Sequence, residues 1–380
     1  MQSTRRGFVQ TTLGATGIAL APAQTSQPSG EWRNKQSGMS YRKLGRTGMM
    51  ISEVVSGGDP IRSNNWQHLN LALEMGLNYL DMAPAYGNGD CELSYGKLLG
   101  GSSAKRDKVF LTTKISIFNR MRNQMYKEIF DGLPGEKKTA IQKRADEMRA
   151  ASLAEKPGYF MEYYPGQRNQ FPPTYLANAM AQDYAHKVEA SQKFRDAIKQ
   201  SLDESLKRVG TDHFDTVMCP HGACVVQELE NPHIYETFLE MKKAGKVRFL
   251  GVTSHNDPAA IVRKATQLGH YDVIMMAYNV CNGGYLEQPI VDAAAKGIGI
   301  IAMKAAHAVA SHHKAVNPIP QWRIEKVNRI VPGDMKPPMK AYLWALQNPN
   351  ISAVISNLWD ETYVRENLSL AGKKVDLQPA

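Results

Sequence analysis

The sequence predicts an α/β protein built as a (β/α)8, or TIM, barrel with a long insertion after the third strand. Eight short apolar runs alternate with eight segments of helical periodicity, and glycines follow five of those segments. Strict alternation of this kind favours a parallel sheet, and eight units in a chain of 380 residues are typical of one barrel. A doubly wound sheet is the alternative. It is disfavoured because no Gly-x-Gly-x-x-Gly motif follows the first strand.

The individual elements follow from these patterns. The expected strands cover residues 51–56, 77–82, 109–115, 214–219, 247–253, 273–277, 298–303 and 353–355. The expected helices cover residues 65–75, 92–99, 194–209, 234–244, 258–268, 289–296, 339–347 and 361–370. The glycines that follow helices, where a C-cap glycine belongs, are Gly76, Gly210, Gly245, Gly269 and Gly297.

Two connections exceed the usual length of a loop. The insertion at residues 116–190 contains a predicted helix over 136–153 and an aromatic, proline-punctuated run over 159–175. The second connection, residues 305–334, follows the seventh strand. Both lie on the barrel face where active sites are built. The insertion is either a lid whose aromatic side chains stack on a substrate, or a decorative subdomain or oligomer interface.

The N-terminus has the features of a twin-arginine export signal over residues 1–23. The pair Arg5-Arg6 precedes a phenylalanine, a weakly apolar stretch and an Ala-x-Ala cleavage site. Residues 24–40 are rich in Ser, Gln, Gly and Pro and are expected to be a linker, which leaves 41–380 for the barrel. We expect a periplasmic protein that uses the twin-arginine export machinery. After cleavage, no run is long enough for stable membrane insertion.

Composition and cysteine spacing exclude several classes of partner. The formal charge of +10 comes from scattered basic residues, so we expect no nucleic-acid binding, and a phosphorylated cofactor or acidic ligand is compatible. The spacing of Cys91, Cys219, Cys224 and Cys281 is not a disulfide framework. Around His221, the run from Cys219 to Cys224 lacks a second ligand pair, and the loop histidines His307, His312 and His313 show no ligand spacing. We therefore predict no metal.

Three residues at the ends of neighbouring predicted strands have complementary proton chemistry: Asp81, Tyr86 and Lys114. A tyrosine titrates near ~10 in isolation, and a nearby cation lowers that pKa. A carboxylate paired with the lysine holds the ammonium charged and in place. His221 ends the fourth strand and joins the same rim, where it can orient a carbonyl oxygen. Taken singly, each residue could be a cap, a loop aromatic or a structural side chain.

The sequence resembles the aldo-keto reductase superfamily over most of residues 41–372. The matching segments, in order, are YRKLGRTG at 41–48, Asp81 with YGNG at 86–89, TK at 113–114, LKRVGTDHFD at 206–215, GKVRFLGVTS at 245–254 and RENL at 365–368. Their order and spacing make the resemblance specific. It implies a barrel, a nicotinamide cofactor and a tetrad. In that tetrad Tyr86 is the general acid/base, Lys114 lowers its pKa, Asp81 holds Lys114 and His221 orients the substrate oxygen.

The resemblance also implies cofactor contacts, and here the sequence departs from the family pattern. The candidate cofactor-binding residues are Thr253, Ser254, Met275, Tyr278, Lys304, Asn357, Tyr363, Arg365, Glu366 and Asn367. Glu366 and Asn367 match residues that contact adenine. The positions that clamp the 2′-phosphate of NADP hold Asn357 and Tyr363, for which Arg365 or Lys304 could compensate. Family habit favours NADP, and NAD stays open.

We therefore expect an NAD(P)-dependent oxidoreductase that interconverts a carbonyl and an alcohol on a small polar substrate, such as a sugar, with Tyr86 as proton donor or acceptor. Nicotinamide cofactor should be scarce outside the cytoplasm, so we expect it to be bound before export and recycled in place. The rival is a non-catalytic barrel that binds a ligand or partner through the aromatic insertion. Nucleotide binding discriminates between the two.

Overall fold

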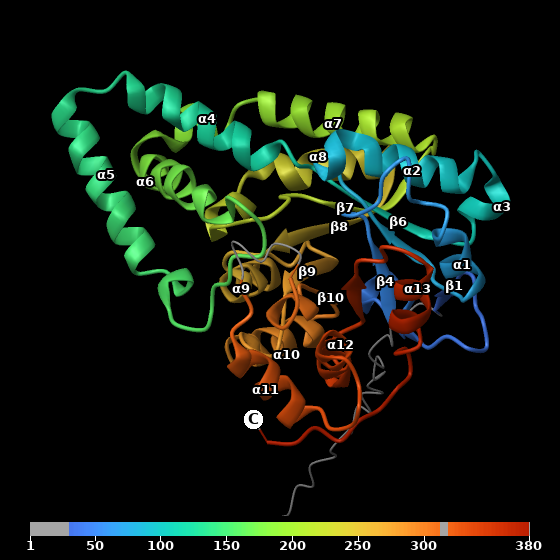
Figure 1. The fold of residues 1–380 in the computed structure, drawn as a ribbon. Coiled ribbons are helices and arrows are strands. Elements are labelled where there is room, and N and C mark those ends of the chain that lie inside the picture. The colour runs from blue at the N-terminus through green and yellow to red at the C-terminus, as the bar shows by residue number, and fades with distance from the viewer. Residues whose placement is uncertain (1–29, 312–317, 380) are drawn as a thin grey trace, which may run out of the picture.

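The computed structural model describes residues 30–311 and 318–379, and the predicted signal at residues 1–23 lies outside them. Eight parallel strands close into a barrel in the order β10-β11-β4-β5-β6-β7-β8-β9, which confirms the predicted fold (Figure 1). Those strands are β4 (Val54–Gly57), β5 (Tyr79–Asp81), β6 (Phe110–Lys114), β7 (Phe214–Met218), β8 (Val247–Ser254), β9 (Val273–Ala277), β10 (Gly299–Met303) and β11 (Ala353–Ser356).

Each of the eight predicted barrel helices is present within a few residues of its expected bounds. They are α1 (Leu69–Glu74), α2 (Asp90–Leu99), α7 (Lys193–Val209), α8 (Pro232–Lys243), α9 (Pro258–Leu268), α10 (Glu287–Ala295), α12 (Pro337–Gln347) and α13 (Glu361–Leu368). The glycines after α7 and α9, Gly210 and Gly269, have positive φ angles, as the C-cap prediction requires. A short helix, α3 (Ser103–Arg106), precedes β6.

The first predicted strand is two strands, which corrects the prediction for residues 51–56. The first part belongs to β3 (Met49–Ser52), which pairs with β1 (Glu31–Trp32) and β2 (Tyr41–Lys43) in a separate small sheet, and only the second part is β4. The break was invisible in the sequence because both strands are buried on either side of it. Because β1 pairs with β3, the described part of the predicted linker, residues 30–40, is attached to the domain.

A charge cluster joins the small sheet to the barrel through Asp215 on β7. Its carboxylate accepts from Arg106 Nη2 at 3.0 Å and Arg248 Nη1 at 2.6 Å, and Arg33 Nη2 lies 3.4 Å away. Burial alone would raise the pKa of Asp215, but the arginine charges hold it below its usual range. The ionised carboxylate therefore fastens the N-terminal segment, through Arg33, to the barrel.

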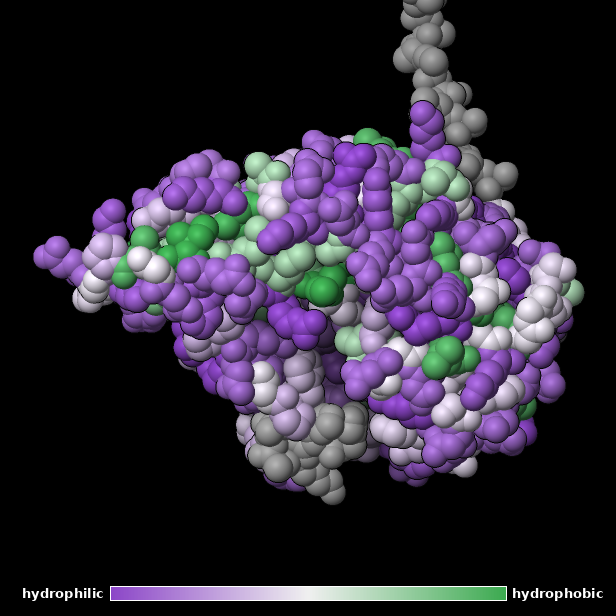
Figure 2. Space-filling view, turned by 90° about the horizontal axis from the view of Figure 1, so that it is seen from above, coloured by the Kyte–Doolittle hydropathy of each residue, from purple (hydrophilic) through white to green (hydrophobic). Residues whose placement is uncertain are grey.

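The insertion after β6 is a three-helix subdomain, whereas the sequence analysis predicted one helix in it. The three helices are α4 (Phe118–Asp131), α5 (Gly135–Ala150) and α6 (Phe171–Val188). The start of α6 was read as a loop because prolines punctuate it, yet proline is common in the first turn of a helix. The subdomain projects from the barrel at the left of Figure 1. Seen from above, it forms a lobe on which apolar side chains gather (Figure 2).

Residues 152–170 form a strap between α5 and α6 that is fastened to the barrel by hydrogen bonds. The hydroxyl of Tyr159 donates to Asp257 Oδ1 at 2.6 Å and accepts from the backbone N–H of Ala259 at 2.7 Å. The amide of Gln167 donates to Asn256 Oδ1 at 2.8 Å. Tyr159, Tyr163 and Tyr164 thus contact barrel loops, and the strap is a fixed wall of the barrel mouth.

The second long connection contains the helix α11 (Gln321–Ile330), and His312 and His313 lie outside the described residues. All four cysteines are free thiols. Within residues 30–311 and 318–379, no group of three or more His, Cys, Asp or Glu side chains could hold a metal ion. No helix of the described chain is long and apolar enough to span a membrane.

Replacing Asp215 with Asn tests the charge cluster. We expect Asp215→Asn to lower the free energy of unfolding by about 3 kcal/mol, because it removes the paired carboxylate from the partly buried Arg106 and one of two carboxylates from Arg33 and Arg248. Because the pKa of Asp215 is lowered in the folded state, its contribution is present above pH about 4 and is lost as the pH falls through the lowered value. Urea unfolding followed by circular dichroism at pH 7 measures the difference.

The matched control removes an exposed ion pair. Lys143 and Glu147 lie 3.9 Å apart on α5 with side chains 77% and 66% exposed, so Glu147→Gln should cost less than about 1 kcal/mol. Equal losses of unfolding free energy in the two variants would show that the Asp215 cluster stabilises the fold no more than an exposed ion pair does.

Candidate functional site

Two cavities open at the carboxyl ends of the barrel strands and meet there. The β11-side cavity, of about 300 Å³, runs from Asp81 and Tyr86 to helices α12 and α13. The insertion-side cavity, of about 750 Å³, runs from Tyr86 and His221 along α4 to the start of α6. Four residues line both: Asp59, Tyr86, His255 and Lys304. The predicted tetrad thus lies around the junction of two compartments.

A buried ion pair forms the base of the tetrad. Lys114 ends β6 and Asp81 ends the neighbouring strand β5, so the parallel register brings their side chains to the same rim. Lys114 Nζ donates to Asp81 Oδ1 at 2.6 Å and to the carbonyl of Met82 at 2.9 Å. Both side chains are almost fully buried, at 1% and 3% exposed. A buried ammonium needs such partners because an unpaired charge in this environment is costly.

A tight turn presents Tyr86 above that pair. Gly87 and Asn88 follow it with φ angles of 60° and 51°, a left-handed conformation that Gly and Asn adopt more readily than other residues. The ring of Tyr86 lies over the lysine, with Lys114 Nζ 4.6 Å from the ring centroid. Tyr86 lines both cavities, so its phenol can meet ligands that enter from either side.

The electrostatic expectation for Tyr86 needs correction. The sequence analysis expected Lys114 to lower the pKa of the phenol. In the structure, burial raises the pKa of Tyr86 well above its ordinary value, and the carboxylates of Asp81 and Asp59 raise it further. The charge of Lys114 is compensated by Asp81, so it does not outweigh burial and the two carboxylates in the free protein. Tyr86 is therefore a neutral phenol, a form in which it donates a proton.

His221 completes the tetrad as a neutral imidazole. Its ring packs edge-on against Tyr86 with centroids 5.9 Å apart. Burial, together with the charge of Lys114, lowers the pKa of His221 to about 3. Its Nδ1 lies 2.7 Å from the hydroxyl of Ser116, a residue that the sequence analysis did not single out. A Ser116 hydroxyl that donates to Nδ1 leaves the ring proton on Nε2 for a ligand oxygen.

The sequence analysis missed two charged or polar residues at the junction, Asp59 and His255. Both lie directly beyond barrel strands, Asp59 after Gly57-Gly58 and His255 after β8. A search for every polar side chain that follows a predicted strand would have found them. Burial, with the nearby charge of Lys304, lowers the pKa of His255 well below its ordinary value, so this second imidazole is also neutral.

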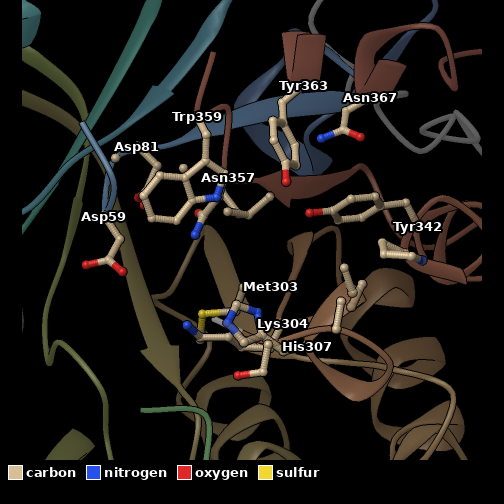
Figure 3. Close-up of a pocket in the computed structure, with 18 of the residues that line it drawn as sticks. Asp59, Asp81, Met303, Lys304, His307, Tyr342, Asn357, Trp359, Tyr363 and Asn367 are labelled. Carbon is tan, nitrogen blue, oxygen red and sulfur yellow. The ribbon is translucent and has the colours of Figure 1, made fainter. Parts of the chain in front are cut away.

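Five of the ten candidate cofactor residues line the β11-side cavity: Met275, Lys304, Asn357, Tyr363 and Asn367. Figure 3 shows Tyr363, Asn367 and Tyr342 at one end of this cavity, and Asp59 and Asp81 at the other. Lys304 has a φ of 61°, a conformation that is rare for a lysine. Its ammonium lies within 5.9 Å of the ring centroids of Tyr163 and Tyr164.

The other five candidates lie away from both cavities. Thr253 and Ser254 bond the backbone that follows His221, at Gly222 N and Ala223 O. The hydroxyl of Tyr278 donates to Glu287 at 2.7 Å, away from the barrel mouth. On α13, Arg365 lies 3.7 Å from Glu361, and Glu366 pairs with Lys336. As placed in the structure, none of these five side chains lines either cavity.

The residues of the β11-side cavity fit a nicotinamide dinucleotide. The lining combines aromatic rings that can stack on a planar base, Trp359 and Tyr363, with the amides of Asn357 and Asn367. Ala305 and Ala306, which follow β10, also line this cavity. Among the described residues, no Arg or Lys lines the end formed by α12 and α13. The described lining therefore offers no cationic side chain to bind a phosphate at that end of the cavity.

Comparison with known proteins gives one family. The family model described as "Aldo/keto reductase family" matches residues 58–153 and 176–376. The match includes β5, β6 and β7, whose ends carry the tetrad. It omits residues 154–175, which contain most of the strap and the first turn of α6.

Individual relatives and a solved structure agree with the family match. Aldo-keto reductase AFTS1 of Alternaria alternata is 24% identical over 231 residues, which are 58% of this chain and 51% of that protein. The chain thus spans about half the length of this curated relative. The holo form of aldo-keto reductase AKR11C1 from Bacillus halodurans has a TM-score of 0.57 and 17% identity, covering 88% of this chain and 92% of its own. At that identity the likeness shows the fold alone.

The protonation state of His221 is directly measurable. We expect the ring of His221 to stay neutral from pH 8 down to pH about 4, because burial lowers its pKa to about 3. Long-range ¹H–¹⁵N spectra of histidine-labelled protein should show the proton on Nε2, and Ser116→Ala should give a mixture of tautomers. A titration midpoint near the ordinary value of about 6.5 would contradict the burial argument.

Proposed function

The chain belongs to the aldo/keto reductase family, and on that premise we propose that it is an NAD(P)-dependent oxidoreductase that interconverts a carbonyl and an alcohol on a small polar substrate such as a sugar. The observation that carries the proposal is the buried Asp81–Lys114 pair beneath Tyr86, at the junction of two cavities. One cavity fits the dinucleotide and the other is open for a second ligand. A binding module has no need of a buried lysine beneath a tyrosine.

The roles of the tetrad follow from its charges. A bound nicotinamide cofactor supplies or accepts hydride at the junction. The neutral Tyr86 phenol donates its proton to the substrate oxygen, and neutral His221 orients that oxygen through Nε2–H. The Lys114 ammonium stabilises the phenolate that remains, and Asp81 fixes the lysine in place. In the free protein Tyr86 is protonated, which is the form that carbonyl reduction requires.

The cavity lining supports a nicotinamide dinucleotide but does not distinguish NADP from NAD. The lining of the β11-side cavity, with Asn357, Tyr363 and Asn367, would hold a nicotinamide dinucleotide, which would supply hydride chemistry. NADP is proposed from the habit of the family. The described lining presents no cation beside Tyr363, and Arg365 is turned to the outer face of α13. NAD is therefore retained as the alternative dinucleotide.

We also propose that the protein works in the periplasm after export through the twin-arginine machinery. The support is the arginine pair, apolar stretch and small-residue site within residues 1–23. Since that route carries folded proteins, the cofactor can be bound before export. A cofactor that stays bound needs a reaction that recycles it, such as a paired oxidation and reduction or an epimerisation through a keto intermediate.

Removing one hydroxyl tests the role of Tyr86. We expect Tyr86→Phe to lower kcat for reduction of 4-nitrobenzaldehyde by at least about 100-fold, because the proton donor is lost. Cofactor affinity, measured by quenching of protein fluorescence, should change less than about threefold. Turnover like that of the wild type would remove Tyr86 from the mechanism.

Tyr95 provides a matched control for this variant. It is also a fully buried phenol, its hydroxyl lies 2.9 Å from Ser56 Oγ, and it lines neither cavity. Tyr95→Phe should keep kcat within about threefold of the wild type, since no proton transfer passes through it. A comparable loss in both variants would point to general destabilisation.

Nucleotide binding tests the enzyme class itself. We expect the purified mature protein to bind NADPH or NADH with a Kd in the micromolar range or below, and mass spectrometry of periplasmic protein to detect a copurifying dinucleotide. Binding of neither nucleotide would favour the non-catalytic barrel that the sequence analysis kept as its rival. Binding without copurification would leave the enzyme class standing and contradict preloading before export.

A further inference from the structure

We propose that the insertion-side cavity is a carbohydrate site with an outer subsite, so that the substrate is a disaccharide or glycoside. The reacting sugar lies at Tyr86, and the second sugar ring lies between α4 and the residues that begin α6. The proposal rests on the proposed function for the reacting carbonyl and extends it to the substrate class. It begins from the size of this cavity, about 750 Å³, which lies high in the usual range of small-molecule sites, roughly 300–1,000 Å³.

The cavity is elongated along one face of α4. Asn119, Asn123 and Lys127 all line it and follow one another at intervals of four residues, so they lie on the same side of the helix. Eight residues of α-helix at a rise of about 1.5 Å span about 12 Å. The cavity therefore continues well beyond the position of a single sugar ring that contacts Tyr86 and His221.

The opposite wall is formed by polar residues that begin α6. Asn169, Gln170 and Thr174 line the cavity across from α4. The two walls are joined where Asn123 Nδ2 donates to Thr174 Oγ1 at 3.1 Å. Gln170 Nε2 donates to the hydroxyl of Tyr164 at 2.9 Å, which brings an aromatic ring to the same wall. The space between the walls is thus bordered on both sides by hydrogen-bonding groups.

The chemistry of these walls matches hydroxyl groups. Each amide offers donors and an acceptor, as a sugar hydroxyl does, and five amide side chains line this one cavity: Asn119, Asn123, Gln124, Asn169 and Gln170. The Oδ1 atoms of Asn119 and Asn123 are buried with no hydrogen-bond partner in the described structure. Gln124 and Asn169 are exposed, and an apolar substrate would remove water from such amides without giving them hydrogen-bond partners, at a cost in affinity.

The strap wall of this site is preorganised. The strap is anchored through the Tyr159–Asp257 and Gln167–Asn256 hydrogen bonds, so the wall does not have to form when ligand binds. The family match omits residues 154–175, which contain Tyr164, Asn169 and Gln170. The strap wall of the outer subsite therefore lies in residues that the family match omits, whereas the α4 wall lies within the matched residues 58–153.

Paired sugars test the proposal. Isothermal titration calorimetry with the mature protein should show that maltose, cellobiose or lactose binds at least tenfold more tightly than glucose or galactose. In the presence of NADPH, the same disaccharide should have a kcat/KM at least tenfold above that of its monosaccharide. Equal affinity of every disaccharide and its monosaccharide would overturn the outer subsite.

Two substitutions at the outer wall give the expected loss. The double variant Gln124→Ala/Asn169→Ala should weaken disaccharide binding by roughly tenfold or more, since one neutral hydrogen bond contributes roughly fivefold. Monosaccharide binding should stay within about twofold. Gln142→Ala is the matched control. Gln142 bonds Asp146 on α5 at 3.0 Å as Gln124 bonds Glu128 on α4 at 3.1 Å, but it lines neither of the two junction cavities.

The same experiments separate this proposal from the proposed function. Absence of turnover with 4-nitrobenzaldehyde and with every sugar would refute the oxidoreductase, and calorimetry would still decide the subsite. Turnover of 4-nitrobenzaldehyde and monosaccharides without any gain from a second ring would overturn the subsite and leave the oxidoreductase intact. Equal loss of mono- and disaccharide binding in the double variant would also overturn it.

Discussion

The buried ion pair between Lys114 and Asp81 is the constraint on which the rest of the site depends. An ammonium that is 1% exposed at the barrel rim is stable only with a counter-charge and hydrogen-bond acceptors. Asp81 and the Met82 carbonyl supply them, and the second bond fixes the start of the loop that presents Tyr86. Gly58 belongs to the same arrangement, since a Cβ there would lie 2.3 Å from the Asp81 carbonyl oxygen.

The Lys114–Asp81 pair lies near the junction where the two cavities meet. The barrel alone provides the β11-side cavity, through the ends of β4, β10 and β11 and the helices that follow them. The insertion provides the other cavity, because α4 lies beside His221 and the strap is hydrogen-bonded to the loops after β8 and β9. Lys304 and Asp59 lie where the two meet and carry opposite charges. We therefore assign cofactor binding to the barrel and substrate selection to the insertion, and the two cavities meet at the junction.

The sequence was most informative where a local pattern has one structural solution. Alternating apolar runs and helical segments predicted the barrel, and residues at strand ends had to converge on one rim, so Asp81, Lys114 and His221 were found together. The sequence was least informative where side-chain packing determines the direction of a side chain or a pKa. The side chain of Tyr278 turns outward to Glu287, and the pKa of Tyr86 depends on burial that no motif reveals. The helix α6 was missed because prolines occur in both loops and helix starts.

The most direct test of the central claim is a double-mutant cycle on Asp81 and Lys114, read out as kcat/KM for carbonyl reduction. If the two side chains act as one unit beneath Tyr86, Asp81→Asn and Lys114→Met should each lower kcat/KM by at least about 100-fold. The kcat/KM of the double variant should then be no more than about threefold below that of the less active single variant. If the loss of kcat/KM in the double variant equalled the product of the two single losses, the account would be contradicted. Asp81 and Lys114 would then act independently of each other on Tyr86.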